Sequence, residues 1–173
     1  IVSDAPIASL GSVARLVRRP VDPGAHDSFP EVGIRSFGKG TFHKPALSRE
    51  QLGTKRVFLI KAGDLVFMNV FAWEGAIAVA RHEDEGRVAS HRFMTHEVVP
   101  GKATPEFICH HFLTETGLEQ IRAASPGSAG RNRTLGITKL HAAKVPVPPF
   151  KAQQRFSTLV KKLGELRRLQ QET

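Results

Sequence analysis

The chain has 173 residues, 40% of them hydrophobic and 24% charged, so its length fits one domain with an appendage and its apolar content is enough for a proper core. No apolar run approaches the roughly 20 residues of a membrane-spanning helix, the opening "IVSDAP" does not resemble a signal peptide, and a single Cys109 excludes an intrachain disulfide, which together favour the cytoplasm. The net charge of +9 favours a polyanionic partner such as nucleic acid, although charge alone leaves an acidic protein surface or plain solubility open.

In the N-terminal half, the sequence predicts a short helix or strand, two loops and a sheet. Asp4 is a suitable N-cap for the helical pattern that follows, but Gly11 within this pattern leaves a short strand open. Loops are expected in the proline-rich stretch 20–30 and around "SFGKGTFHKP", residues 36–45. Apolar runs rich in β-branched residues come next, and we expect them to form an antiparallel or mixed sheet. These runs are Val57–Ile60, Leu65–Val70, Ala76–Ala80 and "VASHRFMTHEVV", residues 88–99.

The C-terminal half predicts mostly helix. In "TPEFICHHFLTETGLEQIRAAS", Thr104 is a suitable N-cap, Pro105 fits the first helical position, and Gly117 is expected to break the helix. A basic loop, "PGSAGRNRTLG", and a short helix or strand at residues 137–148 follow. The elements together predict an α+β protein, in which a mixed or antiparallel sheet with flanking helices precedes a long C-terminal helix.

The last helix is expected at residues 151–172 and would be about 33 Å long. Pro146, Pro148 and Pro149 stand just before it and form a stiff connector, because proline favours extended backbone and cannot join a helix interior. An apolar stripe at heptad spacing allows two interpretations: an ordinary packing helix, or a coiled-coil helix that pairs with a partner or with a second copy of the chain. The stripe residues are Phe156, Leu159, Leu163 and Leu166.

Two short motifs suggest a nucleotide-binding loop and a zinc site, but the residues around them do not support either site. "GIRSFGKG", residues 33–40, nearly spells a phosphate-binding loop, but Gly40 stands where the Mg²⁺-binding hydroxyl is needed. Cys109, His110 and His111 are adjacent, whereas zinc needs spaced ligands, so Cys109 is expected to be a small buried residue. We therefore predict no catalytic residue, no metal and no cofactor in this chain.

Three basic patches suit nucleic acid better. Arg and Asn side chains make bidentate contacts with guanine and adenine edges, and Lys and glycine-rich backbone suit phosphates. One such patch is more often a solvated surface, but three in one basic domain favour DNA contact by at least one of them. The patches are Arg35, Lys39, His43 and Lys44; Ser90, His91 and Arg92; and Arg131, Asn132 and Arg133 with Lys139.

Three stretches show a characteristic order: "IKAGDLVFMNVFAWEGAIAV" (60–79), "GRVASHRF" (86–93) and "SPGSAGRNRTLGITKLHAAKVPVPPFKAQQRF" (125–156). In the last one, a small-residue loop leads to a strap of the form P-x-P-P-hydrophobic-x-x-Q that opens a long helix. In this order the stretches resemble the specificity (S) subunit of type I restriction-modification enzymes. The resemblance covers nearly the whole chain. It departs at Ala152, where an acidic residue usually precedes Gln153, which affects only the capping of the helix.

The resemblance implies a DNA target recognition domain at residues 1–145, followed at 146–173 by the strap and a spacer helix that can also dimerise. In that family two such domains each read one half of a split DNA sequence, and their helices pair as an antiparallel coiled coil. This chain would be half an S subunit that binds double-stranded DNA. It would dock a methyltransferase (modification) subunit, which uses S-adenosylmethionine, and a restriction subunit, and these partners would supply the catalysis.

Two other interpretations stay open. The chain would also fit a DNA-binding fragment of a self-contained nucleic-acid-modifying enzyme whose catalytic half lies elsewhere. An RNA-binding adaptor is favoured less, because readers of single-stranded RNA stack bases on exposed aromatic residues, and this chain has no Tyr and a single Trp73.

Overall fold

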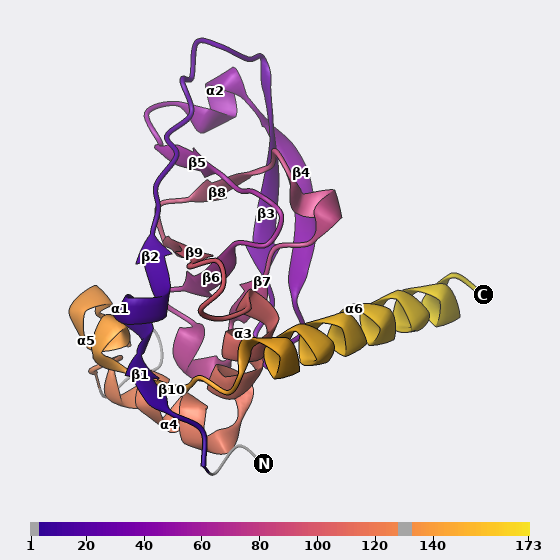
Figure 1. Ribbon diagram of the computed structural model, residues 1–173. Coiled ribbons are helices and arrows are strands. Elements are labelled where there is room, and N and C mark those ends of the chain that lie inside the picture. The colour runs from indigo at the N-terminus through magenta and orange to yellow at the C-terminus, as the bar shows by residue number, and fades with distance from the viewer. Residues whose placement is uncertain (1–3, 128–132) are drawn as a thin grey trace.

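Three layers make up the body of the protein: a layer of helices and two four-stranded sheets (Figure 1). The computed structural model describes residues 4–127 and 133–173. The α+β class, the antiparallel and mixed sheets and the long terminal helix are confirmed. In the described part of the chain, no helix combines the length and the apolar character that crossing a membrane requires.

The first sheet is antiparallel throughout and lies between the helices and the second sheet. Its strands, in spatial order, are β2 (Ala14–Leu16), β9 (Phe93–Val98), β6 (Leu65–Met68) and β7 (Ile77–Val79). Successive side chains of a strand point to opposite faces. Leu65 and Phe67 pack among the helices, whereas Val66 between them packs toward the second sheet. Strand β6 is therefore buried on both faces, which explains why its sequence is continuously apolar and does not alternate with polar residues.

The second sheet is mixed, because β3 and β8 run parallel within it. Its strands, in spatial order, are β4 (Thr41–Ser48), β3 (Ser28–Ile34), β8 (Val88–Ser90) and β5 (Val57–Leu59). The loop expected around residues 36–45 is correct only for its first part: β3 and β4 form a hairpin with its tip at 35–40, and residues 41–45 belong to β4. β4 lies at the sheet edge with most of its residues exposed, so it shows no apolar alternation and tolerates Pro45. The single strand expected at 88–99 is two strands, one in each sheet.

The helices cover the face of the first sheet that points away from the second. The break predicted at Gly117 is wrong: the first long helix ends at Leu113, and Thr114 caps the next one by accepting the Gly117 N–H at 3.2 Å. Gly117 lies inside that helix, where a Cβ would collide with the carbonyl of His111. The close crossing of the two helices is therefore what requires glycine here. The α-helices on this face are α1 (Leu10–Val13), α3 (Pro105–Leu113), α4 (Glu115–Ala123) and α5 (Ile137–Ala142), whereas the short helix α2 (Arg49–Leu52) packs against the second sheet.

The proline strap belongs to the body before the long helix begins. Strand β10 (Lys144–Pro146) pairs antiparallel with β1 (Ile7–Ser9), which precedes α1. The N–H of Val147 donates to the carbonyl of Pro6 at 2.7 Å and continues this ladder. The domain boundary expected between residues 145 and 146 thus falls inside a paired strand.

Helix α6 (Phe150–Glu172) is anchored by its first two turns and then extends away from the body (Figure 1). Gln153 is fully buried: its Oε1 accepts the Thr104 N–H at 3.0 Å and its Nε2 donates to the Pro148 carbonyl at 2.9 Å. The Ser157 hydroxyl donates to the Thr104 hydroxyl at 2.7 Å. The glutamine of the strap motif therefore locks the start of α6 onto the start of α3. Every residue of α6 after Ser157 is exposed.

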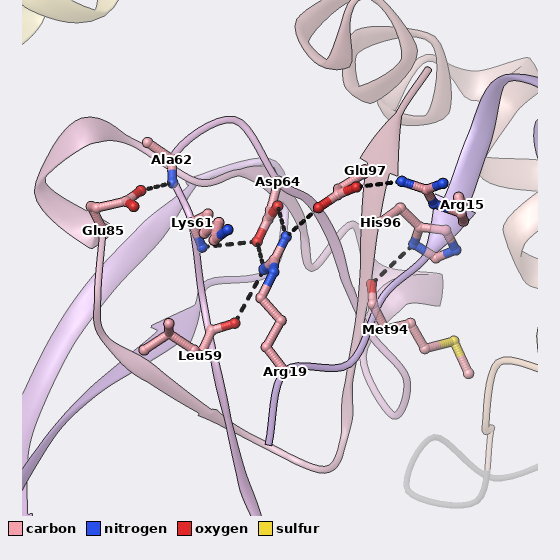
Figure 2. A network of polar contacts seen from close by, with 10 residues as sticks. All are labelled: Arg15, Arg19, Leu59, Lys61, Ala62, Asp64, Glu85, Met94, His96 and Glu97. Carbon is pink, nitrogen blue, oxygen red and sulfur yellow. Dashed lines mark hydrogen bonds and ion pairs between the residues drawn. The ribbon is translucent and has the colours of Figure 1, made fainter. Parts of the chain in front are cut away.

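Figure 2 shows an ion-pair network that joins the segment after β2, the β5–β6 turn and β9. Arg19 donates to both carboxylate oxygens of Asp64, at 2.7 and 3.0 Å, and to Glu97 at 2.9 Å; Glu97 also accepts from Arg15 at 2.7 Å. Asp64 is buried, and its Oδ2 also accepts the Lys61 N–H at 2.9 Å, which closes the turn into β6. Hydrogen bonding to Asp64 raises the pKa of Arg19 against the opposing effect of burial, and Arg15 and Arg19 lower the pKa of Glu97.

A pair of histidines links the first sheet to the helical layer. Nε2 of His96 on β9 lies 2.9 Å from Nε2 of His141 on α5, and Nδ1 of His96 lies 3.2 Å from the Met94 carbonyl. Since Nδ1–H donates to that carbonyl, Nε2 of His96 accepts from His141. Burial, followed by repulsion from His141, lowers the pKa of His96 to about 4.

We expect the free energy of unfolding to fall by about 3 kcal/mol between pH 7 and pH 4 because of His96. The unfolded chain binds this proton near the ordinary pKa of 6.5, whereas the folded protein keeps His96 neutral down to about pH 4. The unfolded state carries more protons in that window, so stability is lost as the pH falls. Urea unfolding at stepped pH measures the effect. His96→Gln should flatten this part of the profile, and His82→Gln at an exposed position should not; equal slopes in both variants would contradict the assignment.

Candidate nucleic-acid interface

The connection between β6 and β7, residues 69–76, brings together segments that are far apart in the sequence. It contains the short helix η1 (Ala72–Glu74). At its start, the Asn69 N–H donates to the Arg92 carbonyl at 2.9 Å, and the Asn69 carbonyl accepts the Leu135 N–H at 2.8 Å. The turn that carries the second basic patch and the segment that follows the third one therefore both lie against Asn69.

The other end of the β6–β7 connection holds the tip of the β3–β4 hairpin, where the first basic patch lies. The N–H groups of Phe37 and Gly38 donate to the carbonyls of Glu74 and Gly75 at 2.9 and 3.0 Å. The segments that carry the first two basic patches, and the segment that follows Arg133 of the third, thus contact one short connection. The sequence contains each segment but no signal for their meeting, because these contacts are made by backbone atoms.

The β3–β4 hairpin presents Arg35 and Lys39 to solvent. Arg35 is exposed and its guanidinium lies over the Phe42 ring, 4.7 Å from the centroid. Lys39 is exposed at the tip. Lys44 pairs with Glu31 at 2.7 Å, which offsets its charge. Arg35 and Lys39 are therefore the cations of this patch that an anion can approach.

His43, on the same strand, is engaged within the fold. Its Nε2 lies 2.9 Å from Oδ1 of the buried Asp84, and the Thr41 hydroxyl donates to the other oxygen at 2.7 Å. Burial raises the pKa of Asp84, but hydrogen bonds from the Arg81 backbone, Thr41 and His43 outweigh it, so the net pKa is lowered. These contacts fix the 3₁₀ helix η2 (His82–Asp84) against β4.

The turn between β8 and β9 carries the second patch. His91 and Arg92 are exposed, while Ser90 is half-buried and its hydroxyl accepts the Arg92 N–H at 3.4 Å. Arg18, from the segment after β2, donates to the His91 carbonyl at 3.4 Å. This contact adds a cation that the sequence analysis did not single out.

A second arginine that the sequence analysis missed lies beside Arg18. The guanidinium groups of Arg18 and Arg56 lie 5.0 and 5.8 Å from the centroid of the Phe58 ring on β5. The two basic residues that closely precede an aromatic one in "KRVF", residues 55–58, are the signal that points to Arg56. Arg18 joins it only through the fold.

The third patch is described only in part. Arg131 and Asn132 lie outside the described residues. Lys139 is an exposed residue of α5, and Arg133 is half-buried.

The side chain of Arg133 makes contacts within the protein. Its Nε donates to the Ser125 carbonyl at 3.2 Å and its Nη2 to the Arg122 carbonyl at 3.1 Å, at the C-terminal end of α4. Its guanidinium also lies 5.1 Å from the centroid of the Trp73 ring in η1. Arg133 thus caps a helix end, where a cation is favoured by the helix dipole. It also ties that helix to the β6–β7 connection.

Cys109 is buried, as predicted. Burial, reinforced by the nearby Glu106, raises the pKa of its thiol to about 12, so the reactive thiolate is scarce at neutral pH. His110 is exposed, and Nε2 of His111 lies 3.1 Å from the Lys144 carbonyl in β10. Over residues 4–127 and 133–173, no three His, Cys, Asp or Glu side chains are grouped as a metal site would require.

The predicted stripe of α6 divides between two surroundings. Phe156 packs against the rings of Phe107 and His110 on α3, with centroids 5.6 and 5.0 Å apart, so it belongs to the anchored part and not to the exposed stripe. The leucines that follow point to solvent, with 49% to 61% of each exposed. This leucine stripe comprises Leu159, Leu163, Leu166 and, in addition to the prediction, Leu169.

The opposite side of α6 lines a groove against the body. Lys161 pairs with the buried Glu106 at 3.2 Å, and Arg168 pairs with Glu83 at 3.5 Å. Gly164 lies between these two pairs and also lines the groove. Because successive residues of a helix are rotated by about 100°, these positions lie roughly opposite the leucine stripe. The ion pairs thus orient α6 and leave the leucines facing away from the body.

Neither a protein-family model nor a curated protein matches this sequence. Solved structures do match, and two of them are aligned over nearly the whole length of this chain. One is the HsdS subunit from Thermoanaerobacter tengcongensis, with a TM-score of 0.70 and 23% identity over 98% of this chain and 45% of that one. The other is a chain from a structure on the assembly and conformational transition of the type I R-M system, with a TM-score of 0.68 and 23% identity over 96% of this chain and 45% of that one. The protein therefore has the fold of a little less than half of an HsdS subunit.

Proposed function

We propose that this chain is a non-catalytic DNA-recognition module of a type I restriction-modification system and reads one half of a bipartite target. The observation that carries the proposal is the fold, which matches part of an HsdS subunit over 98% of the chain. The net charge of +9 and the meeting of basic segments at the β6–β7 connection support DNA as the ligand. Methylation and cleavage belong to the modification and restriction subunits that the module docks.

Within this proposal the described cations rank by how free they are to approach DNA. Arg35, Lys39 and Arg92 are exposed and come first. Ser90, His91 and Lys139 supply further polar contacts next to them. Lys44 and Arg133 come last, because an ion pair and a helix cap already occupy their charged groups. Arg131 and Asn132 are not part of this ranking. Their side-chain chemistry still makes them candidates for contacts with base edges.

The leucine stripe of α6 supports a spacer role for this helix. A second helix, from another copy of the chain or from a longer relative, would cover the leucines, and the strap sets the angle at which α6 leaves the body. The modification subunit would dock on the assembled module. Gln153 is the residue that holds this angle, since it is buried and hydrogen-bonds both the strap and α3.

We expect Lys39→Gln combined with Arg92→Gln to weaken duplex binding and to reduce its salt dependence. Each phosphate contact contributes about 0.9 to the slope of log K against log salt, so losing two should make the slope shallower by about 2. Fluorescence anisotropy of a labelled duplex across a salt series measures both quantities.

The matched control removes the same charge from α6, by Lys151→Gln combined with Lys162→Gln. Both lysines are exposed on the helix, so this variant should keep the wild-type slope. If the control loses as much affinity as the first variant, the interface is in the wrong place. If the wild-type chain binds no duplex even at low salt, DNA recognition itself is rejected.

A further inference from the structure

Phe37, at the tip of the β3–β4 hairpin, combines two unfavourable features. It is 73% exposed, and among the described residues other than glycine it alone has a positive φ, of 63°. The left-handed conformation is unfavourable for a residue with a Cβ, and an exposed phenyl ring forgoes burial. Such conformations persist only where the surrounding structure imposes them, and they concentrate at functional sites.

The surrounding structure does impose this conformation. The N–H of Phe37 and the N–H of Gly38 donate to carbonyls of the β6–β7 connection, and the Ser36 hydroxyl donates to the Glu74 carboxylate at 3.0 Å. Gly75 carries no side chain where a Cβ would come within 3.3 Å of the Phe37 backbone. The tip is therefore clamped through its backbone while the ring stays outside. A side chain presented from a fixed backbone loses little conformational freedom when it binds.

The neighbours of Phe37 suit a ligand that offers both phosphates and stacked rings. Nζ of Lys39 lies 6.0 Å from the centroid of the Phe37 ring, and Arg35 is exposed on the same hairpin. Gly40 has open space where a side chain would be, which lets a backbone approach closely. An acidic protein surface could also accept the cations and the ring, but a ring flanked by two cations matches the alternation of base step and phosphates in the proposed DNA ligand.

We propose that Phe37 is an apolar wedge that enters a base step of duplex DNA while Lys39 and Arg35 contact the flanking phosphates. Phe is one of the side chains that proteins insert between base steps, where it unstacks and kinks the duplex. Pyrimidine–purine steps yield most easily, so the wedge favours them. The inference rests on the proposed DNA-recognition function and adds to it a specific residue and a kind of contact.

The variant Phe37→Gly distinguishes between two roles of Phe37, as a DNA-contacting wedge or as a residue that stabilises the fold. Glycine adopts a positive φ without strain, so the variant should keep or raise the melting temperature of the chain. Loss of the ring should weaken binding roughly tenfold on a duplex that the wild-type chain has selected from a randomised pool. The charge of the surface is unchanged, so the salt dependence should remain that of the wild type. Ile7→Ala, which truncates another exposed apolar residue, is the matched control and should bind as the wild type does.

A spectroscopic signal tests insertion directly. With 2-aminopurine placed at successive positions of the selected duplex, the wild-type chain should brighten the fluorescence at one step, because unstacking relieves quenching, and Phe37→Gly should not. The wedge is overturned if Phe37→Gly binds as tightly as the wild type or if no position brightens. It is equally overturned if the variant loses binding to a modification subunit and keeps its affinity for DNA. If the wild-type chain selects no duplex at all, the DNA-recognition proposal fails and the wedge fails with it.

Discussion

Arg19→Met should destabilise the protein by roughly 3–5 kcal/mol, because it leaves a buried carboxylate without its partner. Arg19 makes a two-pronged contact with Asp64, whose side chain is only 3% exposed. Methionine replaces the packing of the arginine stem but supplies neither charge nor hydrogen bonds. Urea unfolding at one fixed protein concentration and neutral pH measures the loss; a constant concentration is needed because self-association would add to the apparent stability.

The same network contains its own control. Arg15 donates to Glu97, as Arg19 does, but its side chain is 74% exposed, and exposed ion pairs contribute about 0–1 kcal/mol. Arg15→Met should therefore change stability little. Asp64→Asn in the Arg19→Met background should recover part of the loss, since an amide oxygen can still accept the Lys61 N–H and no buried charge remains. If Arg15→Met and Arg19→Met cost the same, or if the double variant is the least stable, burial of Asp64 is not the cause.

This network matters for the candidate interface because it fixes the segment that leads from β2 toward Arg18. The carbonyl of Arg19 also accepts the Leu59 N–H at 2.7 Å, so the segment is held against β5. Loss of Arg19 should thus loosen the place where Arg18 meets the His91 carbonyl. Arg19 itself is not expected to contact DNA. DNA binding should therefore weaken in Arg19→Met only as far as the chain unfolds or the segment that carries Arg18 becomes less ordered.

Patterns along the chain predicted the elements whose cause is local. The apolar runs of β6 and β7, the Thr104–Pro105 start of α3 and the span of α6 all follow from residue types and their spacing. Strand β4 was missed because an exposed edge strand needs no apolar face. Gly117 was misjudged because its role is to let two helices cross, which is a contact across space.

The candidate site shows the same division. Each basic patch is visible as a cluster of residue types, but their meeting depends on backbone hydrogen bonds that any sequence could make. Arg133 reads as a ligand-binding residue in a basic loop, whereas its partners are two carbonyls at the end of α4. Gln153 is the opposite case: the strap motif marked it, and only the structure shows that it joins the strap to α3.

We expect the chain to form a concentration-dependent dimer through the leucine stripe, and Leu159→Glu combined with Leu163→Glu to make it monomeric. Burying a leucine stabilises by roughly 1.5–3 kcal/mol, and the leucine stripe leaves four of them facing solvent on each chain. A two-fold partner covers the same patch on both chains at once. Two glutamates in the stripe would place charged groups in the apolar contact between the paired helices, where burying a charge is costly. Sedimentation over a concentration series measures the change.

The variant should leave the body folded, because the stripe faces away from the groove and α6 is anchored elsewhere, through Gln153 and Ser157. Gln154→Glu combined with Thr158→Glu adds the same charge at exposed positions off the stripe and should still dimerise. A wild-type chain that remains monomeric at high concentration would remove the basis for this pairing. Unfolding of the body in the Leu159→Glu, Leu163→Glu variant would show that the leucines are core residues.

Pairing through the stripe has a consequence for the DNA that the dimer selects. α6 has 23 residues and is therefore about 35 Å long, close to one turn of B-DNA. In an antiparallel pair the two bodies lie at opposite ends of the helices and are related by a two-fold axis, so they should read inverted copies of one half-site at least about one turn apart. Duplexes selected by the wild-type chain should then be inverted repeats with a fixed spacing, and the glutamate variant should select single half-sites. Direct repeats, or a spacing that varies freely, would mean that the helices do not hold the bodies in this arrangement.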